Sequence, residues 1–123
     1  MGVIAYFLDS YALIEIIKEN KNYKKFQDAI NFTSLMNLLE IHYIISKNFG
    51  SKKADEIVNK FKEMLIGFNI QDIEEASRFR IKNIQKKFSY IDCLGYATAF
   101  NRNLIFVTGD KQFESLENVE FVK

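Results

Sequence analysis

Two short apolar runs, each leading into an aspartate, constrain the fold of this chain more than any other feature. Val3 to Leu8 ends at Asp9, and Leu104 to Val107 leads through Thr108-Gly109 to Asp110. Unbroken apolar runs of this length are typical of strands buried on both faces of a parallel sheet. In an open α/β sheet, ligands bind outside the carboxyl ends of the strands. We therefore expect Asp9 and Asp110 to lie at the ligand-binding edge.

The segments between these runs have helical periodicity. Ser10 is predicted to cap a first helix that ends near Asn20 to Asn22, and Thr33 or Ser34 to cap a third, Leu35 to Ile45. This third helix is apolar almost all round, so we expect most of its surface to be buried. The remaining predicted helices are Tyr23 to Ile30, Ser51 to Gly67, a helix capped by Asp72 that buries Ile73, Ala76, Phe79 and Ile84, and one opened by Ser89 or Tyr90.

Further candidate strands are Phe68 to Ile70 and Val119 to Val122. In the helix that begins near Ser89, small residues at Gly95, Ala97 and Ala99 would allow close packing on a sheet. Alternation of strands with helical connections predicts an α/β protein, a three-layer α/β/α fold with a central, mainly parallel sheet. The length of 123 residues predicts one domain, residues 1–123.

Composition excludes several classes of function. A net charge of +1 is unlike that of a general nucleic-acid coat protein, so any contact with nucleic acid should be local. The single cysteine, Cys93, and single histidine, His42, exclude an internal disulfide and the usual zinc patterns. No signal peptide or membrane-spanning stretch is present, which predicts a cytoplasmic protein with no membrane association.

Candidate functional residues are the acids Asp9, Glu40, Asp92 and Asp110. Each also has an ordinary structural interpretation. Asp9 could be a helix cap, Asp92 a first-turn acid favoured by the helix dipole, and Asp110 a turn residue beside Gly109. Glu40 could belong to a solvated stripe on its helix.

Considered together, these acids point to a metal site, because the predicted sheet places at least two of them at one edge. Like charges about 4 Å apart repel by ~1 kcal/mol in water and ~4 kcal/mol near a protein surface, so a bound cation is the simplest compensation. Oxygen-only ligand sets favour Mg²⁺ or Mn²⁺. Such an ion can activate water and neutralise a phosphate under in-line attack, which predicts phosphodiester hydrolysis.

Other chemistries have less support. The glycines are scattered and form no phosphate-binding fingerprint. A nucleophile pair of Cys93 and His42 is conceivable, but both lie in helices as expected of packing residues. Neither is assigned a role.

The sequence resembles the PIN-domain ribonucleases, and within them the VapC-type toxins of toxin–antitoxin pairs. The resemblance covers essentially the whole chain, and its most specific part is the C-terminal block; the residues that carry it are Phe7-Leu8-Asp9-Ser10 with Leu13-Ile14, Thr33-Ser34 with Leu39-Glu40-Ile41, Asp92 with Ala97-Thr98-Ala99, and Leu104 to Asp110 with Phe113. The segment Cys93-Leu94-Gly95 departs from the family, where small apolar residues are more usual.

This resemblance implies a PIN-like fold and a Mg²⁺- or Mn²⁺-dependent endoribonuclease acting on RNA. The family's metal-binding acids fall on Asp9, Glu40, Asp92 and Asp110. Its small hydroxyl positions look like Ser10 and Thr108, which would orient the acids or a metal-bound water. It also implies a homodimer and a cognate antitoxin whose C-terminal tail covers the active site.

Local positive charge for RNA could come from Arg78, Arg80, Lys82, Lys86 and Lys87, although a solvated helix face explains this run slightly better. Tyr11 and Tyr90 are candidates for base stacking. One alternative is a non-catalytic PIN-fold module that binds RNA or protein. Another is a phospho-receiver domain, which is the weaker alternative because it expects paired acids after the first strand.

Overall fold

The computed structural model describes residues 2–123 and has a parallel sheet at its centre. Its strands are β1 (Ala5–Leu8), β2 (Ile30–Phe32), β3 (Ile105–Thr108) and β4 (Val119–Phe121), in the order β2-β1-β3-β4. Every neighbouring pair is parallel. The carboxyl ends of all strands therefore lie at one edge, as the sequence predicts.

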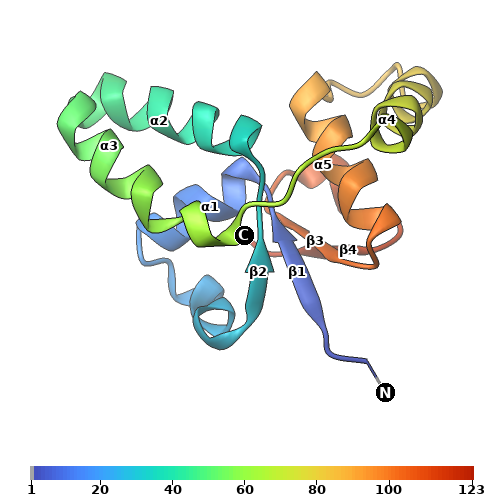
Figure 1. Ribbon diagram of the computed structural model, residues 1–123. Helices are drawn as coiled ribbons and strands as arrows, with labels where there is room; N and C mark the ends of the chain where they lie inside the picture. The colour runs from blue at the N-terminus through green and yellow to red at the C-terminus, as the bar shows by residue number, and fades with distance from the viewer. Residues whose placement is uncertain (1) are drawn as a thin grey trace.

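Helices cover both faces of the sheet (Figure 1). One side carries α1 (Ser10–Ile17), α2 (Leu35–Phe49) and α3 (Ser51–Lys60), and the other carries α4 (Ile70–Lys82) and α5 (Tyr90–Asn101). Short 3₁₀ helices are η1 (Lys21–Asp28), η2 (Lys62–Met64) and η3 (Lys111–Phe113). This arrangement confirms the predicted three-layer α/β/α fold.

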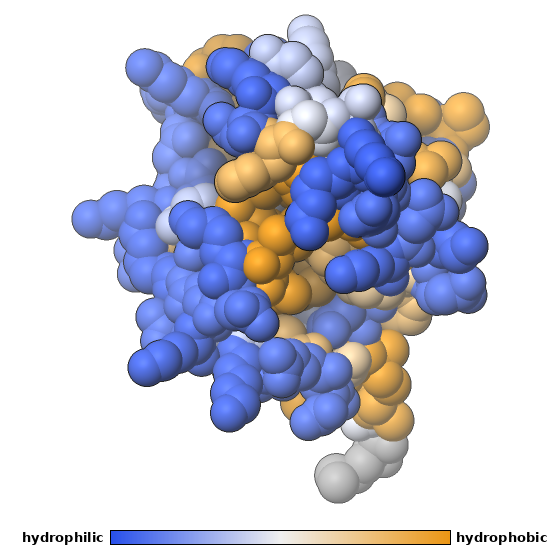
Figure 2. Space-filling model, turned by 90° about the vertical axis from the view of Figure 1, so that its left-hand side faces the viewer, coloured by the Kyte–Doolittle hydropathy of each residue, from blue (hydrophilic) through white to orange (hydrophobic). Residues whose placement is uncertain are grey.

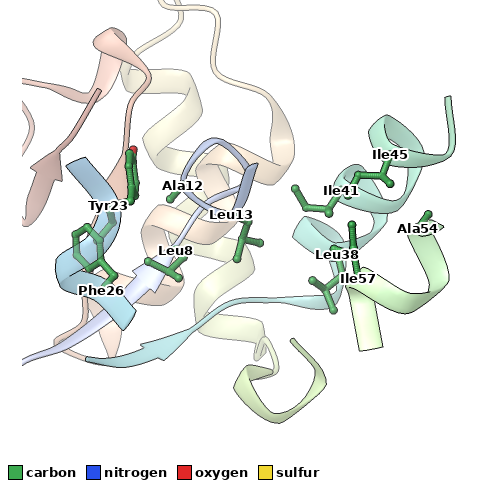
Figure 3. Packing of buried hydrophobic residues seen from close by; sticks show 11 residues of the cluster. Leu8, Ala12, Leu13, Tyr23, Phe26, Leu38, Ile41, Ile45, Ala54 and Ile57 are labelled. Atoms are coloured by element: carbon green, nitrogen blue, oxygen red, sulfur yellow. The ribbon is translucent and has the colours of Figure 1, made fainter. Parts of the chain in front are cut away.

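The strand residues alternate between two hydrophobic clusters. Leu8 and Val107 face the side of α1 to α3, where they join the cluster of buried residues drawn in Figure 3. Phe7 and Phe106 face α4 and α5 and stack with ring centroids 5.9 Å apart. Because successive side chains of a strand point to opposite faces, one unbroken apolar run supplies both clusters.

Helix α5 packs closely on the sheet through small residues, as predicted. A Cβ added at Gly95 would lie 3.0 Å from the Phe7 ring. Ala97 and Ala99 are buried in the same cluster. This close contact fixes the first turn of α5, and Asp92 with it, relative to β1 and β3.

The strand β2 is missing from the sequence prediction, which instead extended a helix to Ile30. The actual helix is the 3₁₀ helix η1, which ends at Asp28, and Ile30 to Phe32 then pair with β1. Tyr23 and Phe26 are buried at a spacing that suits either helix type. A three-residue edge strand with Asn31 at its centre has too little apolar pattern to be recognised.

The predicted strand Phe68 to Ile70 is wrong, and the cap of the following helix is misplaced. Asn69 is the N-cap of α4, and Asp72 forms the reciprocal half of a capping box with it. Ser10 is likewise the first residue of α1 rather than its cap, which is Asp9. Ile73 and Ile84 are 52% and 66% exposed, so their predicted burial is also wrong.

The expectation that α2 is mostly buried is wrong as well. Leu35, Leu39 and Tyr43 are 68%, 60% and 64% exposed, whereas Leu38, Ile41 and Ile45 are buried. The helix therefore has two apolar faces, one in the core and one at the surface. On the side of the molecule that carries α2 and α3, Figure 2 shows a hydrophobic hollow between hydrophilic ridges.

Within residues 2–123, no helix combines the length and the apolar character needed to cross a membrane.

Candidate active site

Carboxylates from four different elements of the fold line one open pocket at the carboxyl edge of the sheet. Asp9 follows β1, Asp110 follows β3, Asp92 comes from the first turn of α5, and Glu40 comes from α2. The pocket has a volume of about 580 Å³, and its other lining residues are Ser10, Tyr11, Ser89, Gly109, Lys111 and Lys123. The structure thus brings together every predicted metal-binding acid and Ser10.

Asp9 holds its position through the backbone of the following helix. Its carboxylate accepts a hydrogen bond of 2.8 Å from the Ala12 amide, and its own amide donates to the Val107 carbonyl at 3.2 Å. Asp9 is therefore the cap of α1 and also a pocket residue. The two interpretations of the sequence are compatible.

The environment of Asp9 disfavours its charged form. Burial raises the pKa of Asp9 to about 7; the Thr108 hydroxyl and the Ala12 amide lower it, and the charges of Asp92 and Asp110 raise it further. The side chain is only 5% exposed. A buried carboxylate near other acids is strongly stabilised by an added cation, which supplies the charge that the surrounding protein lacks.

Asp92 is held by a capping box at the start of α5. Its carboxylate accepts from the Ser89 amide at 2.9 Å, and its amide donates to the Ser89 hydroxyl at 3.0 Å. Burial raises the pKa of Asp92, hydrogen bonds to Ser89 lower it, and Asp110 raises it. The carboxylate is thus fixed by the helix terminus while it remains at the pocket.

A chain of hydrogen bonds fixes the orientation of Glu40. The Ser10 hydroxyl donates to the Glu40 carboxylate, and the Asn37 amide group donates to the Ser10 oxygen at 3.0 Å. The Ser34 hydroxyl in turn donates to Asn37 at 2.6 Å. These contacts join α1 to α2 and turn Glu40 toward the pocket.

Thr108 lies beneath the pocket rather than in its lining. It is fully buried, and its hydroxyl oxygen accepts from the Asp110 amide at 3.0 Å. The Asp110 carboxylate accepts from the Gln112 amide at 3.0 Å, which caps η3. Thr108 therefore contacts the turn that carries Asp110, and it is close enough to Asp9 to influence the pKa of that carboxyl.

The donor set of the pocket fits a hard divalent cation. Its acids offer only oxygen, and no His or Cys lines it. Within the described residues, no group of three or more His, Cys, Asp or Glu side chains lies close enough together to hold a metal ion. Carboxylates that share a pocket without closing into a cage suit an ion such as Mg²⁺, which keeps several of its waters.

The positive charge at the pocket comes from lysines that the sequence prediction missed. Lys111 and Lys123 line the pocket, whereas the predicted basic run Arg78 to Lys87 does not. Arg80 stacks on Tyr90, and Lys86 donates to the Gln112 carbonyl at 2.8 Å. Lys123 follows the last strand, and ligands of such sheets bind outside the carboxyl ends of the strands. This position in the sequence was the signal that could have identified Lys123.

Tyr11 lines the pocket, whereas Tyr90 is 76% exposed and borders a separate groove between α4 and α5. Neither Cys93 nor His42 lines the pocket. Cys93 is buried. His42 contacts Asp55 of α3, with Nε2 and Oδ1 2.7 Å apart.

Comparison with known protein families gives a match over most of the chain. The family model described as "PIN domain" matches residues 6–119. No curated protein matches the chain significantly.

Several solved structures share the fold. VapC20 of Mycobacterium tuberculosis, a toxin that cleaves the sarcin–ricin loop, superposes with a TM-score of 0.78 at 13% identity, covering 96% of this chain and 99% of that one. A VapBC2 structure from Rickettsia felis bound to promoter DNA gives 0.76 at 19% identity, covering 98% and 100%. A toxin–antitoxin complex from Klebsiella pneumoniae gives 0.73 at 20% identity, covering 94% and 95%.

Proposed function

Since the chain belongs to the PIN domain family, we propose that it is a metal-dependent endoribonuclease that hydrolyses RNA phosphodiester bonds in the cytoplasm. We propose further that it is the toxin of a type II toxin–antitoxin pair, and that residues 1–123 act as a single domain. The observation that carries the proposal is the pocket lined by Asp9, Glu40, Asp92 and Asp110.

In this proposal Asp9, Glu40, Asp92 and Asp110 bind Mg²⁺ or Mn²⁺. The bound ion would activate a water and neutralise charge on the phosphate. Ser10 orients Glu40 through its hydroxyl, and Thr108 orients Asp110 through the main chain of the turn. Ser10 and Thr108 are therefore positioning residues.

Asp9 also links metal binding to pH. A carboxylate must lose its proton to bind a metal ion. Because the pKa of Asp9 is about 7 without metal, protons compete with the ion at this carboxylate near neutral pH. Burial of Asp9 therefore makes the affinity of the pocket for Mg²⁺ rise with pH up to the pKa.

An antitoxin partner follows from the same proposal, and the exposed face of α2 is where we place it. Leu35, Leu39 and Tyr43 are exposed on α2, the helix that also carries Glu40. A groove of about 330 Å³ beside Leu35 and Leu39 runs between α2 and α3. An apolar antitoxin segment in this groove could continue over Glu40 and cover the acidic pocket.

We assign the homodimer interface to the other apolar face, on α4. Ile73 and Ile81 of α4 and Ile84, just after the helix, are exposed and line a groove of about 460 Å³ with Tyr90 and Leu94 of α5. The exposed acid Glu74 lies toward the start of α4, and the exposed bases Arg78 and Lys82 lie toward its end. Antiparallel packing of α4 on a second copy would pair these charges, because a two-fold interface must be self-complementary.

The proposal is tested by RNA cleavage with the variant Asp92→Asn. The parent should cleave single-stranded or structured RNA in Mg²⁺ or Mn²⁺ and lose activity in EDTA. Asp92→Asn should lose most metal affinity and cleavage yet stay folded, since one source of repulsion is removed. Asp55→Asn, at an exposed acid of α3, is the matched control and should retain activity. Equal cleavage by Asp92→Asn and the parent would overturn the assignment.

A non-catalytic PIN-fold module that binds RNA or protein is the alternative function. It predicts that titration calorimetry detects no Mg²⁺ or Mn²⁺ binding by the parent. A heat signal that disappears in Asp92→Asn favours the nuclease.

A further inference from the structure

We infer that Lys111, Lys123 and Tyr11 form a phosphate-binding wall of the acidic pocket, which holds the RNA backbone beside the carboxylates. The inference rests on the proposed nuclease function and adds to it a substrate-positioning site. Its ligand is a phosphodiester group of single-stranded RNA. Tyr11 supports the wall, and the lysines supply its charge.

The wall is built on the contact between Gly109 and Tyr11. A Cβ added at Gly109 would lie 2.1 Å from the Tyr11 ring, so the ring lies directly against the backbone of the turn that ends β3. Only glycine permits this approach. The Tyr11 ring is thereby held against this turn, at the lining of the pocket.

Lys123 lies over the same ring. Its Nζ is 5.6 Å from the centre of the Tyr11 ring and 6.0 Å from that of Phe121, within the range of cation–π attraction. Its main-chain oxygen accepts hydrogen bonds from the side-chain amides of Asn20 at 3.3 Å and Asn22 at 3.0 Å. The main chain of Lys123 is therefore held in place, and its side chain reaches the pocket.

The lysine charges remain available for an anion. Both lysines line the pocket, yet in the part of the chain that the structure describes neither forms an ion pair with any acid. The acids themselves would repel a phosphate unless a metal ion and nearby cations offset their charge. Lys111 and Lys123 supply positive charge that reduces this repulsion on the side of the pocket formed by the Tyr11 ring.

The test measures binding of a short fluorescein-labelled single-stranded RNA by fluorescence anisotropy, over a series of salt concentrations in Mg²⁺. All variants carry Asp92→Asn, which keeps the RNA intact and also removes one of the acids that would otherwise repel the phosphate when little metal is bound. Lys123→Ala and Lys111→Ala should each weaken binding several-fold and reduce the slope of log K against log salt by about 0.7, the value for one phosphate contact to a single strand. Lys123→Arg should restore both quantities.

Lys52→Ala is the matched control, because Lys52 is an exposed lysine of α3 outside the pocket and its loss changes the net charge equally. Binding and salt slope that stay at the parent values in Lys123→Ala and Lys111→Ala would overturn the inference, as would equal effects of Lys52→Ala. No RNA binding by the protein that carries Asp92→Asn alone would also overturn it. Lysine-dependent RNA binding by a chain that never cleaves RNA would support the wall while the nuclease proposal fails.

Discussion

At the scale of single residues, the same side chains cap helices and line the pocket. The Asp9 and Asp92 carboxylates accept main-chain hydrogen bonds at helix starts and line the pocket as well. These bonds hold each carboxylate in one orientation before any ligand binds. The pocket is therefore preorganised by the same contacts that begin α1 and α5.

Asp9 makes the stability of the metal-free protein depend on pH. Its pKa is raised from 3.8 to about 7 in the folded state, so between these values the folded chain binds more protons than the unfolded chain. Stability should then fall as pH rises through this window, by at most ~1.4 kcal/mol per pH unit, and level off above it. Thermal unfolding in EDTA measures this slope.

The variant Asp9→Asn should flatten the profile in the same window, because the amide does not titrate. Asp92, whose pKa is also raised, adds a slope of the same sign that remains in the variant. An unchanged pH profile in Asp9→Asn would show that Asp9 is not the group responsible.

Gly109 is the residue at which a single methyl group should disturb the site. The Gly109→Ala variant forces the Tyr11 ring to move, because the added Cβ would lie within 2.6 Å of three ring atoms. We expect a destabilisation of about 1–3 kcal/mol, typical of overpacking, and weaker RNA binding. Gly67→Ala is the control, since nothing lies within 4 Å of its added Cβ. Denaturant unfolding and the anisotropy assay measure both effects.

At the scale of secondary structure, an ion pair between a buried carboxylate and a partly exposed arginine joins α4 to α5. The Asp72 carboxylate, fully buried, accepts from Arg102 at 2.9 Å and from the Asn101 amide group at 2.9 Å, and it also caps α4. Burial alone would raise the pKa of Asp72, but hydrogen bonds from Arg102, Asn101 and Asn69 lower it overall. The pair thus fixes the far end of the helix whose first turn carries Asp92.

Removing this carboxylate should destabilise the fold. Asp72→Ala leaves Arg102 without its partner, and we expect a loss of about 2–4 kcal/mol in the free energy of unfolding. The folded pKa is lowered, so this stabilisation is present above pH ~4 and is lost as pH falls through the folded value. Denaturant unfolding at neutral and acidic pH measures the effect. Asp55→Ala, at an exposed pair, should cost under ~0.5 kcal/mol, and equal losses in the two variants would contradict a stabilising role for the Asp72–Arg102 pair.

The capping box of α5 connects this helix directly to the site. Ser89→Ala removes the hydroxyl that accepts from the Asp92 amide, and a lost cap costs about 1 kcal/mol. Because the first turn of α5 then frays, we expect Mg²⁺ affinity, measured by calorimetry, to fall as well. Ser51→Ala, at the first residue of α3, makes no side-chain cap bond and serves as the control. Loss of stability without loss of Mg²⁺ affinity would separate the cap from the site.

At the scale of the whole molecule, the sheet separates two exposed apolar faces, one on α2 and one on α4. Their side chains are too exposed to contribute to either core cluster, for example Leu39 at 60% and Ile81 at 70%. Exposed apolar patches of this kind mark interaction surfaces. Each face borders its own groove, so the proposed antitoxin and a second copy of the chain could bind at the same time.

The assignment of α4 to the homodimer is tested by Ile81→Glu. The substitution places a buried charge in both copies at a two-fold interface. The dissociation constant of the dimer should therefore increase at least tenfold. Sedimentation velocity measures the association state. Leu39→Glu, on the other face, should leave it unchanged. Dissociation by Leu39→Glu but not by Ile81→Glu would move the interface to α2.

The sequence by itself determined the layers of the fold and the edge at which the acids lie. Unbroken apolar runs specify strands buried on both faces, and chain direction in a parallel sheet then places Asp9 and Asp110 at one edge. The capping pattern at Ser89 and Tyr90 also specified where α5 begins, and this placed Asp92 in the first turn of the helix.

Only the tertiary structure decided which way Glu40 faces, that Lys123 reaches the pocket, and which face of α2 stays exposed. Glu40 is held by Ser10, 30 residues away in the sequence, and Lys123 by residues about 100 positions away. Contacts between such distant residues depend on how the elements pack. Hydrophobic periodicity describes one helix or strand at a time. It cannot show whether a second apolar face of a helix is covered by another element or left exposed.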